Sequence, residues 1–154
     1  MERSLIELIE KYNTAGPRYT SYPPAPLFSS AFTAKDYKAE IFRLEEHPAS
    51  PDLSLYVHIP FCDTLCYFCG CTTTITHNRA SIDVYLSYLK KEIDLIAPLL
   101  NKGRKVTQMH WGGGTPTYLS PQQITELGAH IRTLFAFYSN AEVSVEVDPR
   151  GLTY

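Results

Sequence analysis

The sequence lacks any cysteine outside one short segment, any long apolar run and any extended basic cluster. All four cysteines lie between Cys62 and Cys71, whereas a disulfide framework spreads its cysteines along the chain, so we expect reduced thiols and a cytoplasmic location. No apolar run approaches the roughly 20 residues of a membrane span. The net charge is -2 and no basic cluster is longer than the Lys90-Lys91 pair, which argues against nucleic acid and for a small-molecule substrate.

The pattern of residues 1–52 predicts an amino-terminal extension made of two helices and a proline-rich loop. Apolar residues recur at helical spacing within 1–12 and charges interrupt them, so this segment reads as a helix and not as a signal peptide. Residues 13–28 hold four prolines and no apolar periodicity, which predicts an extended loop. A capping-box pattern that begins at Thr33 opens a second helix through Glu46.

Residues 53–154 alternate between strand and helix patterns. Three strands are predicted, over 53–59, 105–111 and 142–148. Helical stripes from Ile82 to Leu100 and from Ile124 to Tyr138 separate them, and Ser120 is a strong N-cap for the second helix. This order predicts an α/β fold with a parallel sheet, in which ligands gather at the carboxyl ends of the strands.

The cysteine segment follows directly after the first predicted strand. Cys62, Cys66 and Cys69 have the spacing C-x3-C-x2-C, with Phe68 before the last of them, and this motif resembles that of the radical S-adenosylmethionine superfamily. Four thiolates normally hold an iron–sulfur cluster, so a cubane held by three leaves one iron open to a ligand. The alternatives are a zinc knuckle and inert buried thiols. Zinc is disfavoured because a single residue separates Cys69 from Cys71 and no histidine lies within the cluster.

A glycine run and an acidic residue lie at the ends of the other two strands. Residues 112–116, GGGTP, lack the lysine of a phosphate-binding loop and the spacing of a dinucleotide site, but such a backbone can approach an amino-acid ligand closely. A plain tight turn is the alternative. If the third strand is covered on both faces, Glu146 needs a partner, and a ribose diol is one candidate. The alternative is that this strand lies at a solvated edge of the sheet. Tyr56 lies on the same face of the first predicted strand as His58 and points toward the carboxyl ends of the strands. His58 and His110 are interpreted as structural histidines.

Five segments together resemble the oxygen-independent coproporphyrinogen III oxidase family. They are PRYTSYPP at 17–24, SLYVHIPFC at 54–62, CYFCGC at 66–71, HWGGGTPTYL at 110–119 and EVDPR at 146–150. The resemblance covers essentially the whole chain. The first of these segments and Cys71 distinguish it from the related heme-chaperone branch, which stays as an alternative together with an inactive truncated product.

The resemblance implies a radical enzyme of heme biosynthesis that converts two propionates of coproporphyrinogen III to vinyl groups, giving protoporphyrinogen IX. It also implies a [4Fe–4S] cluster, one or two S-adenosylmethionine molecules, an electron donor for the cluster and a tetrapyrrole substrate. The implied cluster ligands are Cys62, Cys66 and Cys69. The implied cofactor contacts are Tyr56, Phe68, Gly113 and Glu146 for the first molecule and Gly114 and Thr115 for the second. Cys71 is a candidate catalytic residue and not an expected ligand.

The resemblance also sets an expectation for the architecture. Residues 53–154 are expected to form the first three β/α units of a partial radical S-adenosylmethionine barrel, incomplete at the carboxyl end, with residues 1–52 as its extension. A complete eight-stranded barrel takes about 250 residues. The chain is therefore expected to be a fragment or a truncated product, and the full-length protein to be a monomer.

Overall fold

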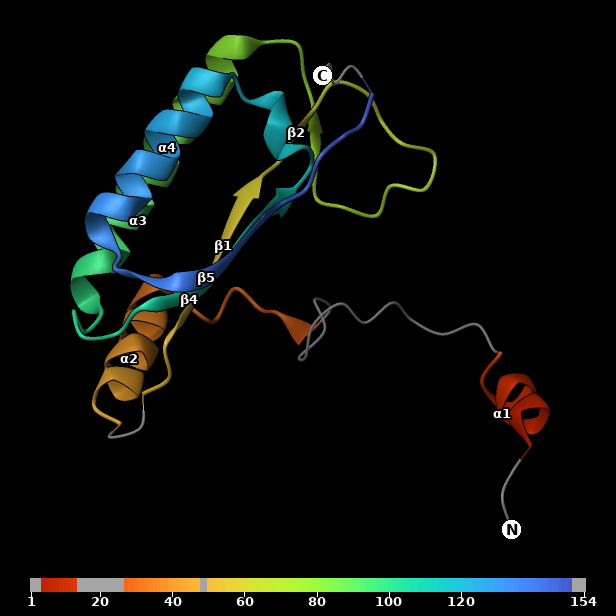
Figure 1. Ribbon diagram of the computed structural model, residues 1–154, viewed down its shortest axis with the longest axis horizontal. Helices are drawn as coiled ribbons and strands as arrows, with labels where there is room; N and C mark the ends of the chain where they lie inside the picture. The colour runs from red at the N-terminus through yellow and green to blue at the C-terminus, as the bar shows by residue number, and fades with distance from the viewer. Residues whose placement is uncertain (1–3, 14–26, 48–49, 151–154) are drawn as a thin grey trace. The chain divides into compact units, whose positions relative to one another are not determined.

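The computed structural model describes residues 4–13, 27–47 and 50–150 (Figure 1). The chain divides into two compact units, Met1–Tyr37 and Lys38–Tyr154. The proline-rich loop predicted over 13–28 falls almost wholly outside the described residues. The predicted boundary between the extension and the barrel, at residue 52, stays a prediction.

The two predicted amino-terminal helices are present. α1 (Leu5–Tyr12) begins with a capping box, in which the Glu7 N–H donates to Ser4 Oγ and the Ser4 N–H donates to Glu7 Oε2. α2 (Ala34–Glu45) begins after Thr33, whose N–H donates to a carboxylate oxygen of Asp36 at 2.8 Å. These contacts satisfy backbone groups that the first turn of a helix leaves unpaired.

A three-stranded parallel sheet forms the centre of the second unit. Its strands are β1 (Leu53–Ile59), β4 (Val106–Gly113) and β5 (Phe137–Val145), in the order β1-β4-β5. The register pairs Tyr56 with His110 and Trp111 with Val145. A second, two-stranded parallel ladder joins β2 (Phe61–Cys62) to β3 (Thr74–Ile75). The predicted α/β class with a parallel sheet is therefore confirmed.

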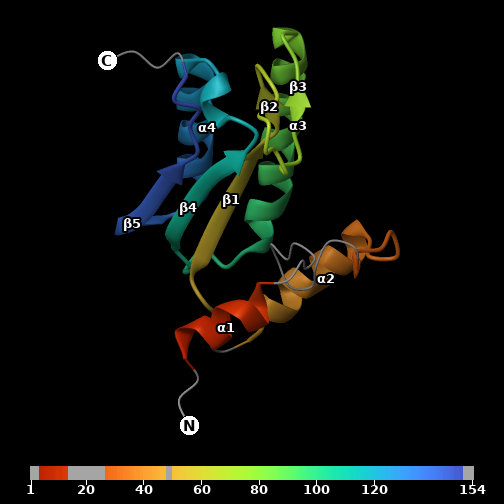
Figure 2. The ribbon, with the colours of Figure 1, turned by 90° about the vertical axis from the view of Figure 1, so that its right-hand side faces the viewer.

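Two crossover helices, α3 (Arg79–Ile96) and α4 (Pro121–Leu134), lie side by side on one face of the sheet (Figures 1 and 2). Each begins at a side-chain cap: Asn78 accepts from the Ala80 N–H, and Ser120, the predicted N-cap, forms a capping box with Gln123. Short 3-10 turns follow α3 and precede α4, at Ala97–Leu99 and Pro116–Tyr118. The buried core between sheet and helices includes Ile59, Ile82, Val106, Trp111, Leu127 and Ile131.

The opposite face of the sheet carries polar side chains, because alternate residues of a strand point to opposite faces. On β1 the buried residues Leu53, Val57 and Ile59 alternate with more exposed Tyr56 and partly exposed His58. This arrangement gives one apolar face for the helices and one polar face that ends at the carboxyl edge of the strands.

Several predicted boundaries are wrong, among them the end of the first helical stripe, which is predicted at Leu100 although α3 ends at Ile96. The last strand is Phe137–Val145 and not 142–148, since a β-bulge lets β5 advance from Phe137 to Glu142 while β4 advances only from Val106 to Gln108. The extra residues interrupt the alternation on which the prediction relied. The stripe assigned to the preceding helix through Tyr138 ends at Leu134, because Tyr138 belongs to that strand.

A further difference lies on β4, which continues two residues past the predicted end at 111. Gly112 and Gly113 still pair with His58 and Ile59 of β1, so the glycine run begins inside the sheet. No helix within residues 4–13, 27–47 and 50–150 is both long and apolar enough to cross a membrane.

Candidate cofactor site

The cysteines lie on a loop whose base is held by backbone hydrogen bonds. Cys62 belongs to β2, and the chain returns at β3, where the Thr74 N–H donates to Pro60 O at 2.7 Å. Between these points, the Cys69 N–H donates to Cys66 O at 3.1 Å, which makes a turn between the two thiol-bearing residues. Figure 1 shows the loop as the long yellow-green excursion beyond the carboxyl end of β1. The sequence motif is thus carried by a loop at the end of the sheet where ligands gather.

The four thiols are free, with Cys62 and Cys66 partly buried and Cys69 and Cys71 exposed. Within the described part of the chain, no group of three His, Cys, Asp or Glu side chains is placed to hold a single metal ion. The donor chemistry fits an iron–sulfur cluster, since three thiols share one loop and none forms a disulfide. Partial desolvation, followed by the nearby Cys69 and Glu146, raises the pKa of the Cys71 thiol.

Two glycines let the end of β4 approach β1 and the cysteine loop. Gly113 has φ +115°, and a Cβ there would lie 2.7 Å from the His58 ring. At Gly114 a Cβ would lie 2.7 Å from Pro60 O and 2.9 Å from Cys62 Sγ. Thr115 Oγ1 also lies 3.4 Å from Cys62 Sγ. The glycine run is therefore a contact between strand ends and a thiol, and not only a turn.

Glu146 follows directly after β5 and is held at the same strand ends. The Gly113 N–H donates to Glu146 Oε2 at 3.1 Å, and His110 Nε2 lies 3.4 Å from Oε1. The Ser144 hydroxyl lies 2.8 Å from His110 Nδ1 and orients that ring. The Glu146 side chain is 51% exposed to solvent, so its carboxylate has lone pairs available for a ligand.

Tyr56 and His58 form a linked pair on the polar face of β1. His58 Nε2 lies 3.0 Å from the Thr72 carbonyl, to which it can only donate, so Nδ1 accepts from the Tyr56 hydroxyl at 3.0 Å. The Tyr56 ring also stacks on His110, with centroids 5.9 Å apart. Burial, with Glu146 as a second cause, raises the pKa of Tyr56. Sequence reasoning treated both histidines as structural, although their alternation with buried residues places them on the polar face.

A cavity of about 480 Å³ joins the predicted residues of the loop to those of the sheet. Its lining residues come from 65–68 of the cysteine loop, 114–115 after β4 and 147–150 after β5. Phe68 and Cys66 therefore share one hollow with Gly114 and Thr115. The Gly113 N–H and Glu146 form a hydrogen bond next to this cavity, and Tyr56 joins that group through its stacking on His110. Cys71 does not line the cavity.

Asp148 and Arg150 are cavity residues for which sequence reasoning gave no role. The Arg150 Nε and Nη2 atoms donate to Asp148 at 2.9 and 2.6 Å, and this guanidinium lowers the pKa of Asp148 to about 2. Arg150 Nη2 also lies 3.6 Å from Cys66 Sγ. The segment EVDPR was visible in the sequence, but no periodic pattern linked it to the cysteine loop.

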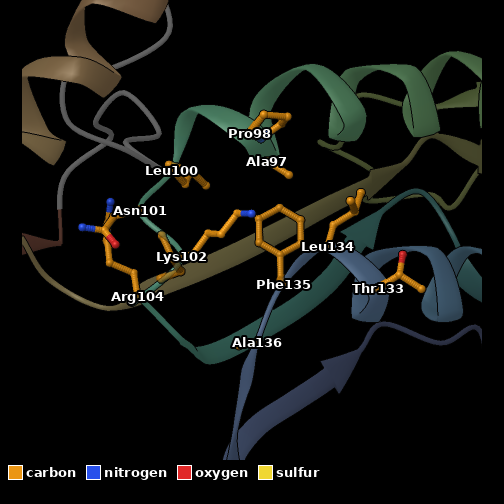
Figure 3. A pocket seen from close by; sticks show the side chains of 11 residues that line it. Ala97, Pro98, Leu100, Asn101, Lys102, Arg104, Thr133, Leu134, Phe135 and Ala136 are labelled. Carbon is orange, nitrogen blue, oxygen red and sulfur yellow. The ribbon is translucent and has the colours of Figure 1, made fainter.

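A different cavity, of about 450 Å³, lies at the amino ends of the strands (Figure 3). Its walls include Leu53, Leu134 and Phe135, and the Lys102 side chain extends toward the Phe135 ring. It contains no thiol and none of the predicted site residues. The opposite, carboxyl end of the sheet is therefore the candidate cofactor site.

Tyr85 of α3 supports the site from the helix layer, since its hydroxyl donates to the His58 carbonyl at 2.6 Å. Burial raises the pKa of Tyr85 above its usual value. We expect Tyr85→Phe to lower the free energy of unfolding by about 0.5–1.5 kcal/mol at pH 7, the usual contribution of one hydrogen bond. Since the folded state holds this proton more tightly, wild-type stability should fall as pH rises above about 10, and the difference from Tyr85→Phe should narrow.

Urea unfolding at pH 7 through 11 measures this effect. Tyr88→Phe is the matched control, because Tyr88 lies on the same helix with 64% of its surface exposed and should show neither effect. A difference between wild type and Tyr85→Phe that stays constant over this pH range would contradict the prediction.

Comparison with known proteins gives close relatives. The chain is 52% identical over 147 residues to the oxygen-independent coproporphyrinogen III oxidase of Escherichia coli (strain K12), a match that covers 96% of this chain and 31% of that protein. A protein of the same name from Mannheimia haemolytica is 50% identical over 144 residues, which cover 94% of this chain and 95% of that protein. No protein-family model matches the chain.

A solved structure agrees with these relatives. It is coproporphyrinogen III oxidase (HemN) from Escherichia coli, described as a radical SAM enzyme, and it matches with a TM-score of 0.79 at 46% identity. The match covers 96% of this chain and 31% of that chain, so this chain spans about a third of the length of its Escherichia coli relative. With half of its residues identical over nearly the whole of the Mannheimia protein, the chain belongs to the oxygen-independent coproporphyrinogen III oxidase family.

Proposed function

We propose that this chain is the cofactor-binding part of an oxygen-independent coproporphyrinogen III oxidase. In this proposal Cys62, Cys66 and Cys69 hold a [4Fe–4S] cluster that, when bound and reduced, supplies the electron for cleaving S-adenosylmethionine. The complete enzyme decarboxylates two propionates of coproporphyrinogen III to vinyl groups. The observation that carries the proposal is the meeting of the cysteine loop with Gly114 and Thr115 around one cavity.

Each of the candidate site residues has its own role in the proposal. Glu146, oriented by the Gly113 N–H and His110, accepts from the ribose hydroxyls of the cofactor. Tyr56, whose hydroxyl is hydrogen-bonded to His58, contacts the same cofactor with its ring. Phe68 lines the cavity beside Cys66, while Gly114 and Thr115 are proposed to contact a second cofactor molecule. Cys71 stays a candidate catalytic thiol.

We further infer that β1, α3, β4, α4 and β5 begin a larger β/α barrel. β5 is the edge of the described sheet, and its Val143 and Val145 side chains are about half exposed. A parallel sheet is usually covered on both sides, so a further β/α unit on this edge would complete their burial. The tetrapyrrole substrate, the electron donor, the monomeric state and the cytoplasmic location belong to the same proposal.

Anaerobic reconstitution with iron and sulfide tests the proposed function. We expect the chain to bind iron and sulfide, to develop visible cluster absorbance, and to give a paramagnetic signal on reduction with dithionite. Added S-adenosylmethionine should then be converted to deoxyadenosine and methionine, which chromatography measures. A chain that binds zinc but assembles no cluster would contradict the proposal, and tight heme binding without cofactor cleavage would favour the heme-chaperone alternative.

A further inference from the structure

The segment after β5 brings a fixed positive charge to one thiol of the cysteine loop. Arg150 Nη2 lies 3.6 Å from Cys66 Sγ, a distance compatible with a hydrogen bond to sulfur. Both residues line the cavity of about 480 Å³ at the carboxyl end of the sheet. The two residues are 84 positions apart in the sequence, so the fold and not the motif brings them together.

Asp148 fixes the position of this guanidinium. Arg150 donates to both carboxylate oxygens of Asp148, from Nε at 2.9 and 3.0 Å and from Nη2 at 2.6 Å, and its backbone N–H donates to Oδ1 as well. Such a forked arrangement holds the planar group in one orientation. Arginine is charged at every relevant pH, and the same pairing raises its pKa further. Arg150 is therefore the positive partner of an ion pair with Asp148, and it directs one N–H toward Cys66.

Charge and hydrogen bonding at cysteine sulfurs set the reduction potential of an iron–sulfur cluster. Reduction adds one electron taken from an external donor and breaks no bond, so it makes the cluster more negative. A nearby cation stabilises that extra charge more than it stabilises the oxidised state. A positive donor on a ligand sulfur thus raises the potential and makes the cluster easier to reduce.

We propose that Arg150, held by Asp148, is a positioning residue that raises the reduction potential of the cluster through Cys66. The inference rests on the proposed function, because it requires a cluster on the cysteine loop. Arg150 binds no iron itself. Its part is to hold positive charge beside one thiolate, which lets a weaker electron donor load the cluster.

Redox titration of the reconstituted chain tests this inference. Arg150→Gln and Arg150→Met remove the charge, Arg150→Lys keeps it without the fork, and Arg132→Gln removes an arginine from the last turn of α4 as the matched control. Iron and sulfide are measured first, and dithionite titration followed by paramagnetic resonance then gives the midpoint potential. We expect the two neutral variants to lower the equilibrium constant for reduction threefold to tenfold, or about 28 to 59 mV for one electron.

The expected shift is modest because 59% of the Arg150 side chain is exposed to solvent. The Lys variant should lie between the neutral variants and wild type, and Arg132→Gln should match wild type. Neutral variants that lose a cluster retained by the Lys variant would also support the charge interaction. Equal potentials in wild type and both neutral variants, or an equal shift in the Lys and Gln variants, would overturn this inference alone. Failure of the wild-type chain to assemble a cluster would overturn it together with the proposed function.

Discussion

Replacing Cys66 with alanine is expected to abolish cluster assembly. A cubane held by three thiolates loses a third of its protein ligands when one is removed. Iron and sulfide per chain should fall to background after anaerobic reconstitution. Conversion of S-adenosylmethionine to deoxyadenosine should be lost with them.

Cys71→Ala is the matched control for cluster assembly, since it removes a thiol from the same loop. Cys71 is exposed and is not an expected ligand, so this variant should retain the wild-type iron content. Loss of iron from Cys71→Ala as complete as from Cys66→Ala would indicate a site of four thiolates, as in a zinc knuckle, and would contradict the assignment of three ligands.

Gly113→Ala is expected to lower the free energy of unfolding by about 2 to 4 kcal/mol, from backbone strain and overpacking together. The φ of +115° is disfavoured for any residue with a side chain, and the new Cβ would overlap the His58 ring at 2.7 Å. Because the Gly113 N–H holds Glu146, the variant should also weaken binding of S-adenosylmethionine. Urea unfolding and equilibrium dialysis of the reconstituted chain measure the two effects.

Gly128→Ala serves as the control for an added methyl group. Gly128 lies inside α4, and a Cβ there would meet nothing within 4 Å. Alanine is the better helix former by about 1 kcal/mol, so this variant should be as stable as wild type or more so. If Gly113→Ala unfolded at the same urea concentration as wild type, the close packing of β4 against His58 would not constrain the site.

Local patterns in the sequence predicted most of the sheet and its helices. β1 has the predicted bounds because its alternation is regular from Leu53 to Ile59. The start of α4 was predictable because Ser120 and Gln123 carry a complete capping box. The start of β5 was not predictable, since the bulge between Phe137 and Glu142 breaks the alternation that marks a strand.

The candidate site also combines features that the sequence alone predicts with features that it does not. The cysteine motif and the glycine run are local signals, so they could be read without a structure. The bonds from His110 to Ser144 and Glu146, and from Arg150 to Cys66, join residues that are 34, 36 and 84 positions apart. Such pairs depend on strand register and on where loops end, and a single sequence does not contain that information.

The cysteine loop contributes no cysteine to the described hydrophobic core, so we expect folding not to depend on the proposed cluster. None of the buried core residues in the described part of the chain is a cysteine, and the loop base closes through the bonds from Thr74 to Pro60 and from Thr76 to Cys62. In a zinc finger, by contrast, the energy of metal binding is the energy of folding. We therefore expect the polypeptide to fold without metal, with Cys69 and Cys71 exposed and Cys62 and Cys66 partly buried, before the proposed cluster is assembled. If oxygen damaged the proposed cluster, we would expect a folded protein that can be reloaded instead of one that must be degraded.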